Sequence, residues 1–191
     1  MAKLLLTPED QIQRLNALLN FVASLKELEF SELTKRPNEK SWNTLEVLEH
    51  LNIAYSPYRP KIATALQNMA DSDGSVWNHQ PGFWNRFIIK GQRPKGKKRP
   101  FKIKTLKKFE PILPEKMGQN DAMAVFQQFK ESYGELKRFI LESRQKQIQH
   151  QRISSAIGPI IKFHLPEAFE FLICHAERHK VQIDGILASH T

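Results

Sequence analysis

The 191-residue sequence has one cysteine, Cys174, and no long apolar run. A single cysteine cannot form a disulfide framework or a cysteine-based zinc module. No segment approaches the roughly 20 apolar residues that a transmembrane helix needs. The apolar residues 4–6 are followed directly by Thr7-Pro8-Glu9-Asp10, so they do not form a signal peptide. These absences exclude disulfide-rich and membrane-spanning classes and predict a soluble, cytoplasmic protein with no membrane span.

Acidic residues are absent from residues 86–108, which hold 11 of the 29 lysines and arginines. The rest of the chain has 18 basic against 20 acidic residues, so the formal charge of +9 comes from this one segment. Two glycines and two prolines interrupt it, and it cannot be one continuous helix. We expect a long basic loop or insertion that binds anions or stays solvated. The candidates for binding an anionic ligand are Lys95, Lys97, Lys98 and Arg99.

Four segments repeat apolar residues at spacings of three and four, which is typical of amphipathic helices. They cover residues 8–25, 45–54, 120–140 and 166–186. Pro57 and Pro60 are placed to kink the continuation of the second helix. No segment combines strand alternation with hairpin turns. The predicted fold class is therefore all-α, a four-helix bundle with a long basic connection between helices 2 and 3.

Three of the seven histidines lie on predicted buried faces. His175 and His179 are four residues apart, so both imidazoles project from one helix face and can bind one metal ion. His50 lies on the apolar face of the second helix, one turn after Glu46. The three rings could form a metal site with an open coordination position, and Glu46 is a candidate to orient His50 or to complete the site. The alternative is three separate core histidines that hydrogen-bond to backbone or glutamate groups.

Other residues near these motifs have simpler expected roles. Cys174 is about 100° round the helix from His175, so it faces away from the proposed metal as a packed thiol. Trp42 is expected to anchor the start of the second helix in the core rather than to contact a substrate. The remaining histidines lie in loops or at the tail and receive no role; they are His79, His150, His164 and His190. An alternative for His164 is a position in an entry loop near the site.

Three features of the sequence resemble the DinB/YfiT-like superfamily of metal-dependent enzymes. They are the tryptophan-led segment 41–51, the Gly158-Pro159 turn and the histidine-bearing segment 175–183. The resemblance implies a single domain over residues 1–191, a four-helix bundle with up-down-down-up helix order. It also implies that His50, His175 and His179 bind one divalent metal, with water completing the coordination.

A three-histidine site can activate a bound water or a bound thiol. The resemblance accordingly implies a hydrolase or a thiol S-transferase that acts on a small-molecule substrate, the latter with a low-molecular-weight thiol as a further cofactor. Zinc, nickel and iron all suit imidazole ligands. Two alternatives stay open, a non-catalytic metal-binding bundle and a module that binds an acidic partner or nucleic acid through residues 86–108. Nucleic acid is the less favoured partner because no nucleic-acid-binding motif surrounds the segment. The sequence is also compatible with a homodimer.

Overall fold

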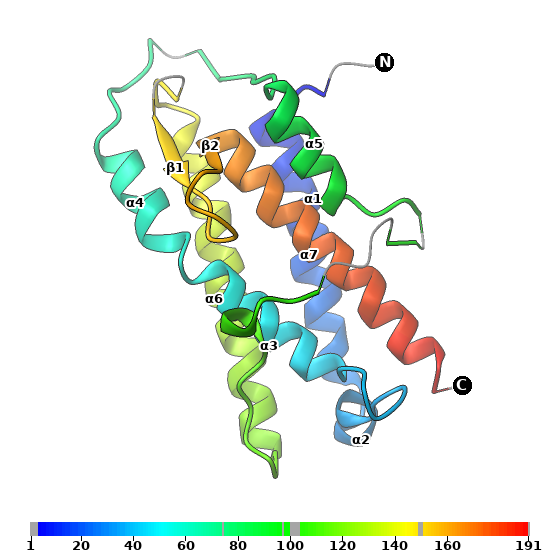
Figure 1. Cartoon of the computed structure of the whole chain (residues 1–191). Helices are drawn as coiled ribbons and strands as arrows, with labels where there is room; N and C mark the ends of the chain where they lie inside the picture. The colour runs from blue at the N-terminus through cyan, green and yellow to red at the C-terminus, as the bar shows by residue number, and fades with distance from the viewer. Residues whose placement is uncertain (1–3, 74, 97, 100–103, 149–150, 191) are drawn as a thin grey trace.

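The computed structural model describes residues 4–73, 75–96, 98–99, 104–148 and 151–190 (Figure 1). It is mostly helical, with one short antiparallel pair of strands. The elements in chain order are α1 (Pro8–Ser24), the 3-10 helix η1 (Leu25–Glu27), α2 (Phe30–Thr34), α3 (Thr44–Tyr55), α4 (Arg59–Gln67), α5 (Phe83–Gln92), the 3-10 helix η2 (Lys107–Phe109), α6 (Gln119–Ser143), β1 (Arg152–Ser154), β2 (Lys162–His164) and α7 (Leu165–Ala188).

The long helices begin where local signals predict and bury the predicted faces. In α1, the Thr7 side chain accepts a hydrogen bond from the Asp10 backbone N–H at 3.3 Å, and Pro8 occupies the first helical turn. The apolar face of α6 is buried along its length, from Ala122 through Phe129 to Ile140. These faces form the core because an amphipathic helix removes its apolar stripe from water only by packing against other helices.

Helix α7 has the most varied neighbours among the long helices. It packs against α1, α3 and α5, while α1 and α3 also pack against α6 (Figure 1). As a result, residues 165–174 of α7 are all buried, and the buried residues of the helix include the polar side chains of Glu167, Glu170, Arg178 and His179. A buried polar group is costly unless it finds a partner. The buried polar side chains of α7 are therefore the first place to look for a functional site.

Three local expectations need correction. The second predicted helix does not continue with a kink: α3 ends at Tyr55, and α4 starts separately at Arg59 with Pro60 in its first turn. A short strand pair, β1–β2, connects α6 to α7, and strands this short leave little alternation to detect in the sequence. The basic segment 86–108 is helical at its start, because α5 runs to Gln92.

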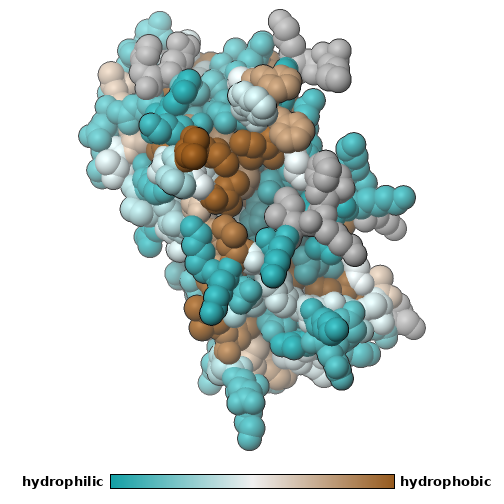
Figure 2. All heavy atoms as spheres, viewed as in Figure 1, coloured by the Kyte–Doolittle hydropathy of each residue, from teal (hydrophilic) through white to brown (hydrophobic). Residues whose placement is uncertain are grey.

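No helix in the described part of the chain is both long and apolar enough to cross a membrane. In the space-filling view, apolar side chains gather in the upper half of the visible face, over the β1–β2 hairpin, with hydrophilic residues around them (Figure 2). Exposed apolar residues of this hairpin include Ile157 and Ile160. The visible face thus carries apolar and hydrophilic areas side by side.

Candidate metal centre

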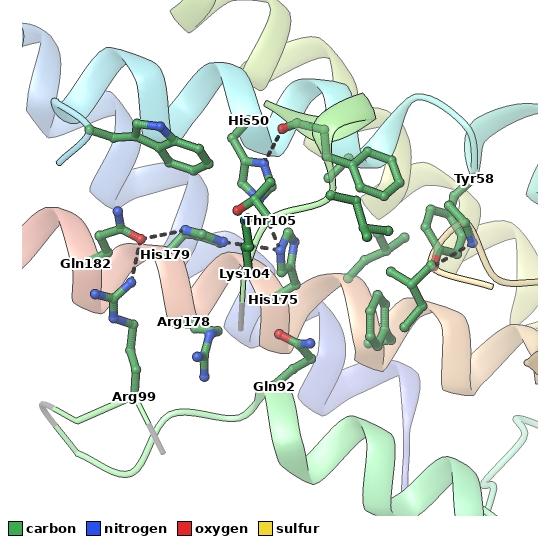
Figure 3. Close-up of a pocket in the computed structure, with 18 of the residues that line it drawn as sticks. His50, Tyr58, Gln92, Arg99, Lys104, Thr105, His175, Arg178, His179 and Gln182 are labelled. Carbon is green, nitrogen blue, oxygen red and sulfur yellow. Dashed lines mark hydrogen bonds between the residues drawn. The ribbon is translucent and has the colours of Figure 1, made fainter. Parts of the chain in front are cut away.

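Two helices bring together the three histidines singled out in the sequence. His50 comes from the middle of α3, and His175 and His179 come from α7 (Figure 3). The Nε2 atom of His175 lies 3.4 Å from that of His50 and 3.2 Å from that of His179. One ring nitrogen from each residue can be chosen so that all three lie within 4.8 Å of one another. The i, i+4 spacing on α7 provides two of these nitrogens, and the packing of α3 on α7 brings the third.

The outer nitrogens of two of the rings have hydrogen-bond acceptors. His50 Nδ1 donates to the backbone carbonyl of Phe109 at 2.6 Å, and His179 Nδ1 donates to Gln182 Oε1 at 3.1 Å. Gln182 Oε1 also accepts from the guanidinium of Arg99 at 2.6 Å, which agrees with an oxygen at that position. Carbonyl oxygens only accept, so each Nδ1 carries the ring proton and each Nε2 presents its lone pair to the centre.

Burial keeps the three imidazoles neutral. Desolvation, followed by the nearby His50 and Arg178, lowers the pKa of His175 to about 3. Desolvation also lowers the pKa of His179 well below its usual value, with further contributions from His175, His50 and Arg99. The pKa of His50 is lowered by desolvation, against a smaller opposite effect of the Phe109 carbonyl. A neutral imidazole is the form that binds a metal ion.

Two of the distances between the three nitrogens suit ligands of one metal ion. Ligand nitrogens at about 2.0–2.1 Å from a tetrahedral zinc are about 3.3 Å apart. The two Nε2 distances of 3.2 and 3.4 Å that His175 makes fall on either side of this value. Two inward lone pairs, from His50 and His179, face the same His175 nitrogen, which can donate only one proton to satisfy them. A cation shared by all three nitrogens would satisfy every lone pair at once.

Glu46 lies away from this centre. Its carboxylate accepts a hydrogen bond from the Asn43 backbone N–H at 2.8 Å, while Asn43 Oδ1 accepts from the Glu46 N–H at 2.9 Å. This reciprocal pair is a capping box, and an ion pair with Arg36 holds the same carboxylate. The orienting contact expected from Glu46 comes instead from the Phe109 carbonyl. A backbone carbonyl leaves no trace in the sequence, whereas Gln182 is three residues after His179 and could have been found from that spacing.

A pocket of about 640 Å³ opens beside the three histidines. Its basic lining residues are Lys40, Lys98, Arg99, Lys104 and Arg178. Two of the predicted anion-binding candidates, Lys98 and Arg99, are therefore in the lining, whereas the exposed Lys95 is not among the lining residues described and Lys97 lies outside the described residues. Lys104 belongs to the basic segment 86–108, whereas Lys40 and Arg178 are distant from that segment along the chain and carry no motif.

Trp42 and Cys174 differ in how closely they follow expectation. Trp42 packs against the core, but its ring is also 5.1 Å from that of His50 and lines the pocket, so it can contact a ligand. Cys174 is fully buried and its thiol donates to Glu170 Oε1 at 3.2 Å, which confirms the packed thiol. Burial, with Glu170 next in importance, raises the pKa of this thiol, so it stays protonated and is no nucleophile.

The remaining histidines do not join the three-histidine cluster. His79 Nε2 is 3.2 Å from Glu167 Oε1, and the rings of His79 and His164 are 5.2 Å apart. The His164 backbone N–H donates to Glu167 at 2.8 Å, so His164 precedes α7 as its cap and is absent from the described pocket lining. His190 follows the end of α7, and His150 lies outside the described residues.

No protein-family model matches the sequence, and no curated protein matches it. Among solved structures, the chain is similar to YfiT from Bacillus subtilis, with a TM-score of 0.55 and 14% sequence identity over 94% of this chain and 85% of that one. YfiT is described as a probable metal-dependent hydrolase with an unusual four-helix bundle topology. At this identity the likeness concerns the fold, and it confirms the four-helix bundle and the resemblance to the DinB/YfiT-like fold.

Proposed function

We propose that the protein is a metal-dependent enzyme whose divalent metal ion is bound by His50, His175 and His179. The observation that carries this proposal is the convergence of three neutral imidazoles, with Nε2 atoms 3.2 and 3.4 Å apart and two Nδ1 atoms bonded to acceptors. The fold shared with YfiT, itself described as a probable metal-dependent hydrolase, supports it. Zinc, nickel and iron are the proposed metals, because imidazole nitrogen suits each of them.

The surrounding residues orient the ligands and shape one side of the site. The Phe109 carbonyl and the Gln182 amide hold the rings of His50 and His179 with their lone pairs inward. The ring of Phe171 stacks on that of His175 at a centroid distance of 6.2 Å and gives the site an apolar side. A divalent metal in this place would supply Lewis acidity to activate either water or a thiol.

Two reaction types fit this centre, a hydrolase and a thiol S-transferase. The described lining of the pocket holds no carboxylate that could accept a proton from water. A thiol loses its proton readily when it binds a metal, so it needs such a base less. This favours the S-transferase, with a low-molecular-weight thiol and a small-molecule electrophile as substrates.

The finer points of the architecture are part of the same proposal. The long connection between α4 and α6 supports an up-down-down-up order, since a connection of this length can return the chain for a parallel neighbour. Figure 1 supports it as well, because α4 and α6 run in the same general direction there.

The buried free thiol of Cys174 suits a reducing cytoplasm. A homodimer is compatible with this site, which draws all its ligands from one chain.

Metal analysis of the purified protein tests the proposal. We expect about one divalent ion per chain in the wild type and in His190→Ala, a matched control whose histidine follows α7, outside the cluster. His175→Ala should lose the ion because it removes the central ligand. Full occupancy in His175→Ala would contradict the assignment of the three ligands.

Turnover separates an enzyme from a non-catalytic metal-binding bundle. The metal-loaded wild type should transfer cysteine to monochlorobimane faster than the metal-free protein and faster than His175→Ala. A hydrolase would instead cleave p-nitrophenyl acetate with the same dependence on metal. Metal binding that stabilises the fold without either activity would support the non-catalytic alternative.

A further inference from the structure

The pocket beside the histidines has charges of one sign. Five cationic side chains line it, and no carboxylate is found among the described lining residues. The cations come from distant parts of the chain: Lys40 precedes α3, Lys98, Arg99 and Lys104 follow α5, and Arg178 belongs to α7. Like charges gathered in a partly buried pocket repel one another.

Two of these cations lie next to the metal ligands. Arg99 donates to Gln182 Oε1 at 2.6 Å, and the same oxygen accepts from His179 Nδ1 at 3.1 Å, so one side chain links the guanidinium to a ligand. Arg178 lines the same pocket as His175 and His179. Both guanidinium groups are therefore within the range at which a molecule held at the histidines can also contact them.

The opposite end of the pocket is apolar. Tyr58 and Phe171 line it with ring centroids 6.2 Å apart, and Ile157 and Ala156 are also in the lining. The Tyr58 hydroxyl bonds to Ser155 Oγ at 2.8 Å and accepts from the Ala156 N–H at 3.2 Å. These bonds leave the Tyr58 ring as an apolar wall of the pocket. In Figure 3, Arg99 and Gln182 lie at one end, Tyr58 at the other, and the three histidines between them.

We propose that the pocket binds an amphiphilic anion, with a carboxylate or phosphate group at Arg99 and Arg178 and an apolar chain or ring against Tyr58 and Phe171. This inference rests on the proposed function, because it names the substrate class of the same site. The fork of a guanidinium matches both carboxylate and phosphate oxygens. The reactive group of such a molecule lies between its two ends, at the histidines.

Calorimetric titration with three matched probes tests the proposal: hexanoate, hexyl phosphate and 1-hexanol. The probes share one apolar chain and differ in the head group. At least one of the two anions should bind about tenfold or more tightly than hexanol, because a hydrogen bond to a charged group contributes about 1.5–3 kcal/mol. The anion that binds with the higher affinity tells whether the site prefers carboxylate or phosphate. Equal affinity for all three probes would overturn the proposal.

Substitutions locate the anionic head. Arg99→Gln should weaken binding of the preferred anion about tenfold and leave hexanol unchanged. The matched control is Lys95→Gln, an exposed cation of the same connection that is not among the lining residues described, and it should bind like the wild type. Arg178→Gln is a second variant, checked by its melting temperature because this side chain is buried. Equal weakening by Arg99→Gln and Lys95→Gln would show a diffuse charge effect and reject the site.

The same samples distinguish this inference from the proposed function. Metal content is measured first, and each titration is run on the metal-free and the metal-loaded protein. Anion preference in a protein that takes up no metal would refute the proposed function and support the anion site. One ion per chain without any preference for the anions over hexanol would refute the anion site alone.

Discussion

Helix α7 carries buried polar clusters on two different faces, and one of them is an ion-pair cluster around Arg14 of α1. The Arg14 guanidinium lies 2.7 Å from Glu170 and 2.7 Å from Glu177. Cys174 lies between the two carboxylates along the helix and bonds to both Arg14 and Glu170. In this cluster, each charge faces an opposite charge and the hydrogen-bonding groups have partners.

The other cluster consists of three neutral imidazoles, those of His50, His175 and His179. Its Nε2 atoms face one another, and the cations of the pocket lie beside them without a carboxylate in the described lining. Polar groups in folded proteins are buried mostly when their partners are present. In the ion-pair cluster the partners are supplied by the protein itself, whereas the histidine cluster leaves room for the metal ion that we propose.

The largest expected effect comes from breaking the ion-pair cluster. Arg14→Met leaves Glu170, which is 0% exposed, without its closest cation. We expect a loss of about 3–5 kcal/mol in the free energy of unfolding, as for other buried pairs with one partner removed. Urea denaturation of the metal-free protein measures it, and the metal content should stay at the wild-type value.

An exposed arginine provides the control for this substitution. Arg138 is 67% exposed and pairs with Glu135 at 3.1 Å, so Arg138→Met should cost about 0–1 kcal/mol. A similar loss of unfolding free energy in Arg14→Met and Arg138→Met would mean that the buried cluster stabilises the fold no more than an exposed ion pair does. Loss of metal in Arg14→Met would mean that the two clusters of α7 depend on each other.

Removal of the metal should have the next largest effect. With free metal at 100 to 1,000 times its dissociation constant, binding stabilises the folded state by about 2.7–4.1 kcal/mol. A chelator should remove this amount from the wild type and from Arg14→Met alike, since the two clusters share no residue. It should remove nothing from His175→Ala. Denaturation with and without the chelator checks all three, and a loss in His175→Ala would place the metal elsewhere.

The smallest expected effect concerns the orientation of a single ligand. Gln182→Leu removes the acceptor of His179 Nδ1, and loss of such an orienting bond weakens metal binding about tenfold to a hundredfold. Competition with a chromophoric chelator measures the affinity. Gln127→Leu, on the exposed face of α6, is the control and should bind metal like the wild type. Wild-type affinity in Gln182→Leu would show that packing alone orients His179.

Local patterns predicted the long helices and the three histidines, but they assigned the wrong role to Glu46. The i, i+4 spacing of His175 and His179 and the apolar face that holds His50 are properties of single helices. The role expected of Glu46 rests on its distance of one turn from His50 along the same helix. The signal for its real role was present, because Asn43 three residues earlier forms a capping box with it and draws its carboxylate to the start of α3.

The sequence by itself determined where the long helices form and which of their faces become buried, because both depend on neighbours three and four positions away. Tertiary structure decided that the His50 face of α3 meets the His175 face of α7 and that the Phe109 carbonyl orients His50. It also brought cations from three separate segments around one pocket. These contacts join residues far apart in the chain, and the packing of whole helices selects them.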